Sequence, residues 1–234
     1  MQSISPTNTK RFALFELGFR PFFLFASLFS IISIAIWTAI FTFGWTLNND
    51  MVTPIAWHGH EMLFAYTGAV VAGFLLTAVR NWTGNNTITG LPLLLLALVW
   101  LLARILPLTH SALLFDWAML FDLSFFIGLI IAAARPIFKA KQWRQLPIIF
   151  ILVLLLSANV TYYLGVFHIL NQGISWGLFS AVYLFMAIIF LIANRVLPFF
   201  IERGIGYKVT LKNYPLIDSI GLPLLAALYI SDVF

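Results

Sequence analysis

The sequence predicts an all-α protein, a bundle of about seven transmembrane helices with its N-terminus in the cytoplasm. Hydrophobic residues make up 62% of the 234 residues and charged residues only 9%, whereas soluble domains are about 45–50% apolar and about 25% charged. Several apolar segments reach the roughly 20 residues that a helix needs to cross the hydrocarbon core. Because open backbone is not tolerated in lipid, these segments are expected to be helices.

Turn residues between the apolar segments set the expected boundaries. Residues 1–20 are predicted to form a basic, partly amphipathic lead-in on the cytoplasmic surface, and residues 21–234 a single transmembrane domain. The first segment has no small-residue cleavage pattern, so we expect a retained helix. The expected helices cover residues 21–45, 55–79, 92–108, 112–134, 146–167, 174–197 and 216–233, with turns or loops at 48–50 and 202–213. Pro198 is expected to end the sixth helix, and Gly221 and Pro223 to interrupt the seventh.

The positions of Lys and Arg predict the orientation. When the helices alternate from a cytoplasmic N-terminus, every basic residue except Arg104 lies in a cytoplasmic segment, and Arg104 lies within the third helix. This asymmetry follows the positive-inside rule and predicts an external C-terminus. It also explains the net charge of +5, so the expected partner is the lipid bilayer and not nucleic acid. All four histidines, His58, His60, His110 and His168, are then expected near the outer surface.

The segment Trp57-His58-Gly59-His60-Glu61-Met62, at the start of the second helix, is the candidate site. The chain has no cysteine, which leaves histidine, carboxylate and methionine as metal ligands. Histidine is the commonest metal ligand and also a haem ligand. We therefore expect His58, His60, Glu61 and Met62 as metal ligands, and His58, His60 and His168 as cofactor ligands. The alternative is that these histidines are interfacial and wetted by lipid headgroups.

The spacing of the first two histidines restricts their roles. On an ideal helix, residues two apart point about 200° from each other, so His58 and His60 can share one ion only where the segment is unwound. In a helix they would serve different centres. His58 would then share a face with Glu61 and Met62, and His60 would lie on an apolar wall suited to a porphyrin.

Charged residues inside the expected helices suggest a polar path. Arg104 and Asp116 lie at similar depth on either side of a tight hairpin, and we expect them to form an ion pair, because intramembrane charges usually have partners. Asp122 lies deeper and has no partner in this scheme, which makes it a candidate proton carrier or hydrogen-bond partner of a cofactor. Asn159 and Tyr163 either support such a site or join helices by hydrogen bonds.

Five sequence blocks together resemble the NnrS family. They are Phe19-Arg20-Pro21-Phe22-Phe23, Trp57-His58-Gly59-His60-Glu61-Met62, the segment from Ala72 to Ala78, Asn81-Trp82-Thr83-Gly84, and Arg195-Val196-Leu197-Pro198-Phe199. The resemblance covers about residues 12–200 and corresponds to the N-terminal half of typical members, which have about twelve helices and further histidine-containing segments. Arg80 departs from the family pattern, which often has proline there.

The resemblance implies a multi-pass protein of the bacterial cytoplasmic (inner) membrane that contains haem and copper. It also implies a part in nitric oxide handling or nitrosative stress tolerance, with a small gas as ligand. Two alternatives stay open. One is a metal-free transporter or channel with an intramembrane Arg/Asp path, and the other is a split member that works only with another membrane subunit or by self-association.

Overall fold

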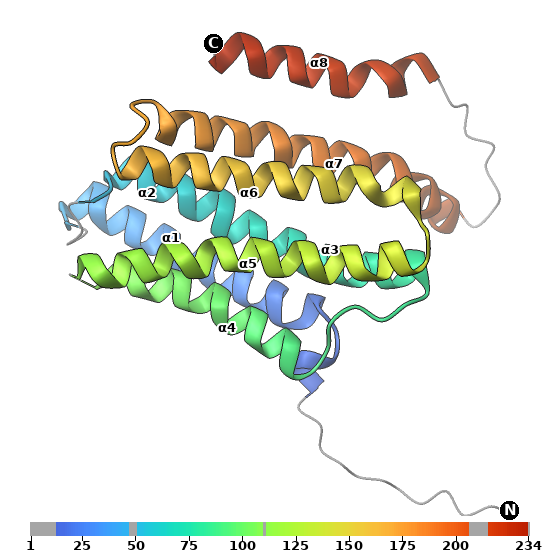
Figure 1. Cartoon of the computed structure of the whole chain (residues 1–234), viewed down its shortest axis with the longest axis horizontal. Helices are drawn as coiled ribbons and strands as arrows, with labels where there is room; N and C mark the ends of the chain where they lie inside the picture. The colour runs from blue at the N-terminus through green and yellow to red at the C-terminus, as the bar shows by residue number, and fades with distance from the viewer. Residues whose placement is uncertain (1–12, 47–50, 110, 206–214, 234) are drawn as a thin grey trace, which may run out of the picture.

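The computed structural model describes residues 13–46, 51–109, 111–205 and 215–233. Within these ranges all regular secondary structure is helical, as predicted. Six helical segments of the described chain are long and apolar enough to cross a membrane, and they run side by side along one direction (Figure 1). The expectations for residues 1–12, for the turn at 48–50, for His110 and for residues 206–213 of the last loop lie outside the described residues.

The first span is α1 (Phe19–Phe43), which follows a short 3₁₀ turn at Ala13–Glu16. It ends at Gly44, whose φ of 65° lets its N–H bond back to the carbonyl of Ala39. Most of its large side chains are exposed, which is expected of a helix that faces lipid.

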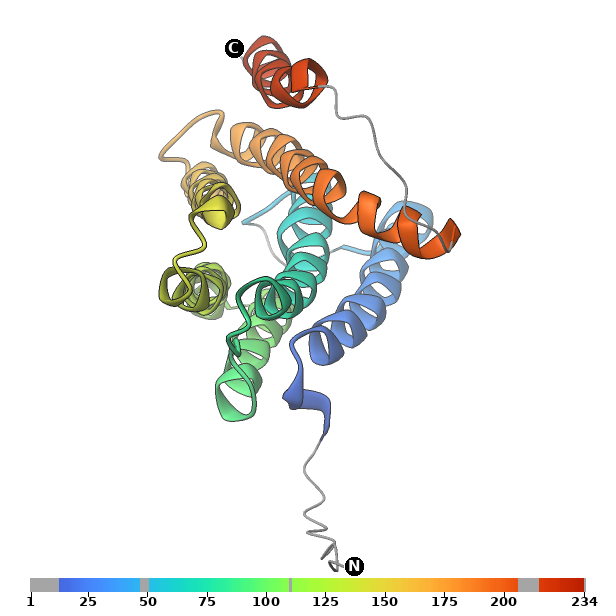
Figure 2. The same ribbon diagram turned by 90° about the vertical axis from the view of Figure 1, so that its right-hand side faces the viewer.

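The second span consists of three helical segments in direct succession. They are α2 (Pro54–His60), a π-helix (Glu61–Thr67) and α3 (Gly68–Thr83). Thr53 caps α2 by accepting a hydrogen bond from the Ala56 N–H at 3.3 Å, and Pro54 occupies the first turn. This span is the most buried of the six and lies in the middle of the bundle, with α1, α5 and α7 around it (Figure 2).

The third and fourth spans form the predicted hairpin. α4 (Leu91–Ile105) continues into a 3₁₀ turn at Leu106–Leu108, and α5 (Ala112–Lys139) returns beside it. A second 3₁₀ turn, Trp143–Gln145, leads into α6 (Leu146–Val166). The boundaries agree closely with the predicted ones, except that α5 extends past Pro136.

The sixth span, α7 (Gly173–Ile205), packs closely on α6. A Cβ atom on Gly177 would lie 2.7 Å from the carbonyl oxygen of Ala158, so the two backbones approach more closely than a side chain allows. The expectation that Pro198 ends this helix is wrong, because α7 continues to Ile205. A transmembrane helix tolerates one proline, since neighbouring groups can satisfy the carbonyl that it frees.

The last helix, α8 (Pro215–Val233), lies beside α7 (Figure 1). It is continuous through Gly221 and Pro223, so the predicted interruption is also wrong. Its apolar part, Pro223–Asp232, is shorter than the six spans.

Candidate functional site

The beginning of the second span has an unusual backbone. A π-helix forms i→i+5 hydrogen bonds, so a π turn holds more residues than an α turn and changes the register of the residues after it. Two side chains also bond carbonyls of this segment: the Thr67 hydroxyl donates to Met62 at 2.8 Å, and the Trp100 indole N–H donates to Ala65 at 3.1 Å. Such π segments are frequent at functional sites.

His60 and Glu61 meet at the junction of α2 and the π-helix, and both are buried. They belong to a group of polar side chains that we call the buried polar cluster. Its members come from four spans and are His60, Glu61, Arg104, Asp122, Asn159 and Tyr163, each less than a tenth exposed.

Arg104, on α4, occupies the centre of the buried polar cluster. One terminal nitrogen donates to both carboxylate oxygens of Glu61, at 3.1 and 3.0 Å, and the other donates to Oδ1 of Asp122 on α5. Two carboxylates therefore share one guanidinium. Such pairing is what makes buried charges tolerable in a membrane protein.

The second oxygen of Asp122 joins the ion pair to α6. Asn159 donates to it from Nδ2 at 2.6 Å, and the Tyr163 hydroxyl donates at 3.3 Å. His60 completes the network, since its Nε2 lies 3.1 Å from Oδ1 of Asn159 and 3.3 Å from Oδ2 of Asp122, and its Nδ1 lies 3.4 Å from Glu61. Both ring nitrogens of His60 are thus engaged within the protein.

These contacts correct the predicted ion pair. Arg104 pairs with Glu61 and Asp122, and not with Asp116, whose side chain is exposed on α5. Asp116 and Asp122 lie nearly two helical turns apart and point about 120° apart around the axis, so only Asp122 faces α4. The expectation of an unpaired Asp122 is therefore wrong, whereas the hydrogen bonds of Asn159 and Tyr163 follow one of the two predicted uses.

His60 does not lie on the expected apolar wall. The flat side of its ring does contact aromatic residues, with Tyr162 stacked at 4.5 Å between ring centroids, but its edge faces the polar groups of the cluster. The segment is helical, so His58 and His60 do point to different neighbours, as the spacing predicts for a helix.

His58 has a different environment. Its ring stacks on Trp37 of α1, with 4.3 Å between centroids and 16° between planes. Its Nδ1 is buried and has no hydrogen-bond partner. Since a buried polar atom without a partner is unfavourable, this nitrogen is a predicted donor that the fold leaves unused. No pattern in the sequence indicated the Trp37 contact, because it joins two spans.

The remaining predicted donors lie elsewhere. Met62 is half-buried in the π-helix, and His168 is exposed in the turn between α6 and α7, with a φ of 57°. That turn and the start of α2 are at the same end of the bundle (Figure 1), as the predicted orientation requires. Among the described residues, no group of three or more His, Asp or Glu side chains has the arrangement of a metal site.

Comparison with known families gives one match. The model of a family described as NnrS protein matches residues 13–234, so the match extends beyond the five blocks of the resemblance and includes α8. No curated protein and no solved structure matches the chain.

Proposed function

Since the chain belongs to the NnrS family, we propose that it is a multi-pass protein of the bacterial cytoplasmic membrane that binds haem and handles or responds to nitric oxide. We propose copper as a second cofactor, and this part of the proposal is supported only by the resemblance to the family. The apolar helices support the membrane location, and the family name accords with a role connected with nitric oxide.

The observation that supports a haem ligand is the unpartnered Nδ1 of His58. An imidazole needs one ring nitrogen without a proton to bind a metal, and the other contacts of its ring fix its orientation. Trp37 supplies such a contact by stacking on the ring. Bound haem would supply an iron centre that binds nitric oxide, and the chain would hold and orient it through His58.

The predicted copper donors are not arranged as a single metal site. His60 and Glu61 are both bonded within the buried polar cluster, and Met62 is not part of that cluster. We therefore propose that His60 and Glu61 act mainly as positioning residues. They connect the start of the π-helix to α4, α5 and α6, and so hold α2, which carries His58. His168 is proposed only as a secondary ligand, from the exposed turn at the same end.

Absorption spectroscopy with metal analysis of the purified chain tests this proposal. We expect the wild-type protein to show a haem Soret band, and His58→Ala to lose it. His168→Ala should retain most of the band, and His60→Ala should lower the yield of folded protein while the folded fraction keeps haem. A wild-type protein without haem would contradict the proposed function, and His58→Ala with full haem content would contradict the ligand assignment.

A second candidate function is supported by the buried polar cluster itself. Two carboxylates and a guanidinium held between four spans are the kind of group that lines a path for ions or small polar solutes. A metal-free transporter or channel would need this cluster to open during its cycle. Proteoliposomes that contain metal-free protein would then show solute flux that Asp122→Asn abolishes, and the absence of flux with any ion or small polar solute tested would reject this alternative.

A further inference from the structure

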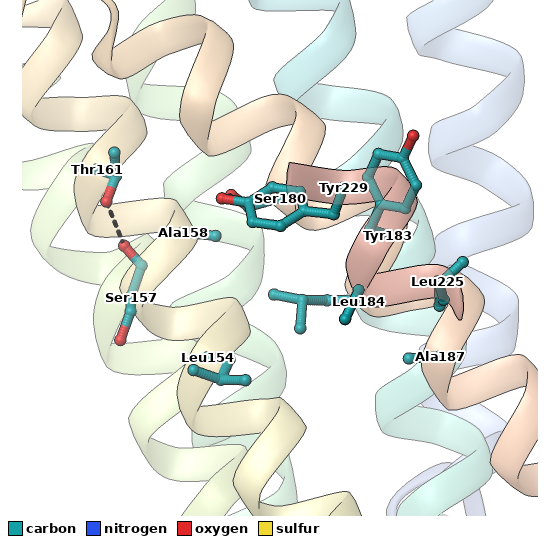
Figure 3. A pocket seen from close by; sticks show the side chains of 11 residues that line it. Leu154, Ser157, Ala158, Thr161, Ser180, Tyr183, Leu184, Ala187, Leu225 and Tyr229 are labelled. Atoms are coloured by element: carbon teal, nitrogen blue, oxygen red, sulfur yellow. Dashed lines mark hydrogen bonds between the residues drawn. The ribbon is translucent and has the colours of Figure 1, made fainter. Parts of the chain in front are cut away.

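A cavity of about 390 Å³ lies between α6, α7 and α8, apart from the buried polar cluster (Figure 3). Its volume is within the range of ligand pockets, about 300–1,000 Å³. No residue of the cluster lines it, although Ala158 in its wall is the neighbour of Asn159 on α6. Whether a ligand binds in this cavity therefore does not depend on whether the chain binds haem.

Most of the cavity wall is hydrocarbon. Leu154 on α6, Leu184 on α7 and Leu225 on α8 face it, and alanines on the same three helices keep it open. Figure 3 shows the α6 side chains on one side of the space and those of α7 and α8 on the other. Because α6 and α7 belong to the six apolar spans, the molecules that can enter such a cavity are those dissolved in the membrane.

Hydroxyl groups interrupt the apolar wall on all three helices. On α6, Ser157 donates to the carbonyl of Val153 at 3.0 Å, and Thr161 donates to that of Ser157 at 2.9 Å. Their hydrogens are used in this way, so these two oxygens offer lone pairs to the cavity.

The α7 and α8 side offers the complementary group. Ser180 and Tyr229 share a hydrogen bond at 2.8 Å, in which either hydroxyl can donate. When Tyr229 donates, the hydroxyl hydrogen of Ser180 can be donated to a ligand. Tyr183 packs edge-on against Tyr229 and donates to Asp232, so its hydroxyl is directed to the end of α8.

We propose that this cavity binds a membrane-soluble amphiphile whose head carries a free hydroxyl group. A hydroxyl both donates and accepts, which matches acceptors at Ser157 and Thr161 together with a donor at Ser180. The hydrocarbon part of the ligand lies against the three leucines. Two membrane components have this chemistry: a glycerol lipid with a free hydroxyl, and the reduced form of an isoprenoid quinone.

Native mass spectrometry of the full chain in detergent tests the proposal. The probes are dioleoylglycerol, a quinol with a decyl tail, and the methyl ethers of both, which lack the free hydroxyl. Ala226→Phe fills the cavity from α8, and Ala227→Phe is the matched control, because Ala227 is also exposed on α8 but does not line the cavity. We expect the affinity of Ala226→Phe for a hydroxyl probe to be about tenfold lower than that of the wild type. Ala227→Phe should bind the probe with wild-type affinity.

A second variant covers the case in which Ala226→Phe does not fold. Ser157→Ala with Thr161→Val removes both acceptors with little change in volume, so it should weaken binding of the hydroxyl probe and leave binding of its methyl ether unchanged. The probe that binds identifies the source of the ligand. Three results overturn the proposal: no probe is retained by the wild type, both phenylalanine variants retain a probe equally, or ether and hydroxyl probes bind alike.

Discussion

At the scale of single residues, the buried polar cluster depends on Arg104. Its guanidinium is the partner of both buried carboxylates, Glu61 and Asp122. Placing ions in a low-dielectric interior costs several kcal/mol each, and the pair is tolerable only while its geometry and hydrogen bonds are complete. Loss of Arg104 would leave two like charges buried together, which is a more severe defect than loss of either carboxylate.

We therefore predict that Arg104→Gln destabilises the protein by about 3–5 kcal/mol, the usual cost of breaking a buried ion pair. Arg104→Gln combined with Asp122→Asn should recover part of the loss, because the second change removes one of the orphaned charges. Thermal unfolding and the yield of monodisperse protein, measured for all variants in one detergent, give the coupling energy.

Asp116→Asn is the matched control for that experiment. Asp116 is on the same helix as Asp122 but is exposed, so its effect should add to that of Arg104→Gln without coupling. Coupling of Arg104 to Asp116, and none to Asp122, would contradict the arrangement of the cluster.

The cluster also illustrates what the sequence can predict at this scale. Arg104, Asp122, Asn159 and Tyr163 stand out as polar residues in apolar segments, and their depth in the membrane can be counted along each helix. Their pairing depends on the rotation of each helix about its axis, which a single sequence does not contain. Without the helix rotations, the prediction relied on proximity across the hairpin, which favoured Asp116 as the partner of Arg104. In the structure the partner on α5 is Asp122.

At the scale of elements, the π-helix at Glu61–Thr67 is the feature that the sequence did not predict. Hydropathy is the same whether a turn holds an i→i+4 or an i→i+5 bond, so no pattern distinguished it from the rest of the span. The lengths of the spans were predictable, because the hydrocarbon core sets them. Pro198 misled the boundary prediction, since proline breaks helices more strictly in water than in a bundle of neighbouring membrane helices.

We predict that Trp100→Phe weakens the region of the π-helix. The indole N–H of Trp100 donates to the carbonyl of Ala65, while the ring packs against Phe25 and Phe29. Phenylalanine retains an aromatic ring there but removes the indole donor. The Gly68 N–H still donates to that carbonyl, so the expected loss is that of one hydrogen bond, about 0.5–1.5 kcal/mol. Thermal unfolding in detergent measures the loss.

Trp117→Phe is the control for this prediction. Trp117 is 49% exposed on α5, and a substitution at such a site usually changes stability by less than about 0.5 kcal/mol. Equal effects of the two tryptophan variants would show that the hydrogen bond to Ala65 contributes nothing to stability.

At the scale of the whole molecule, the orientation in the membrane decides where the site and the cavity face. The α6–α7 turn and the start of α2 share one end of the bundle (Figure 1), and the distribution of Lys and Arg predicts that this end lies outside. α8 runs antiparallel to α7, since Tyr229 bonds Ser180 near the start of α7 and Gly221 packs on Phe190 further along it. The apolar part of α8, Pro223–Asp232, is shorter than the six spans, so a reporter fusion is needed to decide whether α8 also crosses the bilayer.

We predict a cytoplasmic N-terminus and an external C-terminus, and reporter fusions test both. Fusions after Asn49 and after Asn171 should report a periplasmic position, and a fusion after Asn213 a cytoplasmic one, because basic residues precede that point in the sequence.

A fusion after Phe234 tests α8 alone. A periplasmic signal there means that α8 crosses the bilayer, which places the cavity within the membrane, where a lipid-soluble ligand can reach it. A cytoplasmic signal at Phe234 would contradict the external C-terminus and remove α8 from the bundle, whereas a cytoplasmic signal at Asn49 or Asn171 would overturn the orientation of the whole chain.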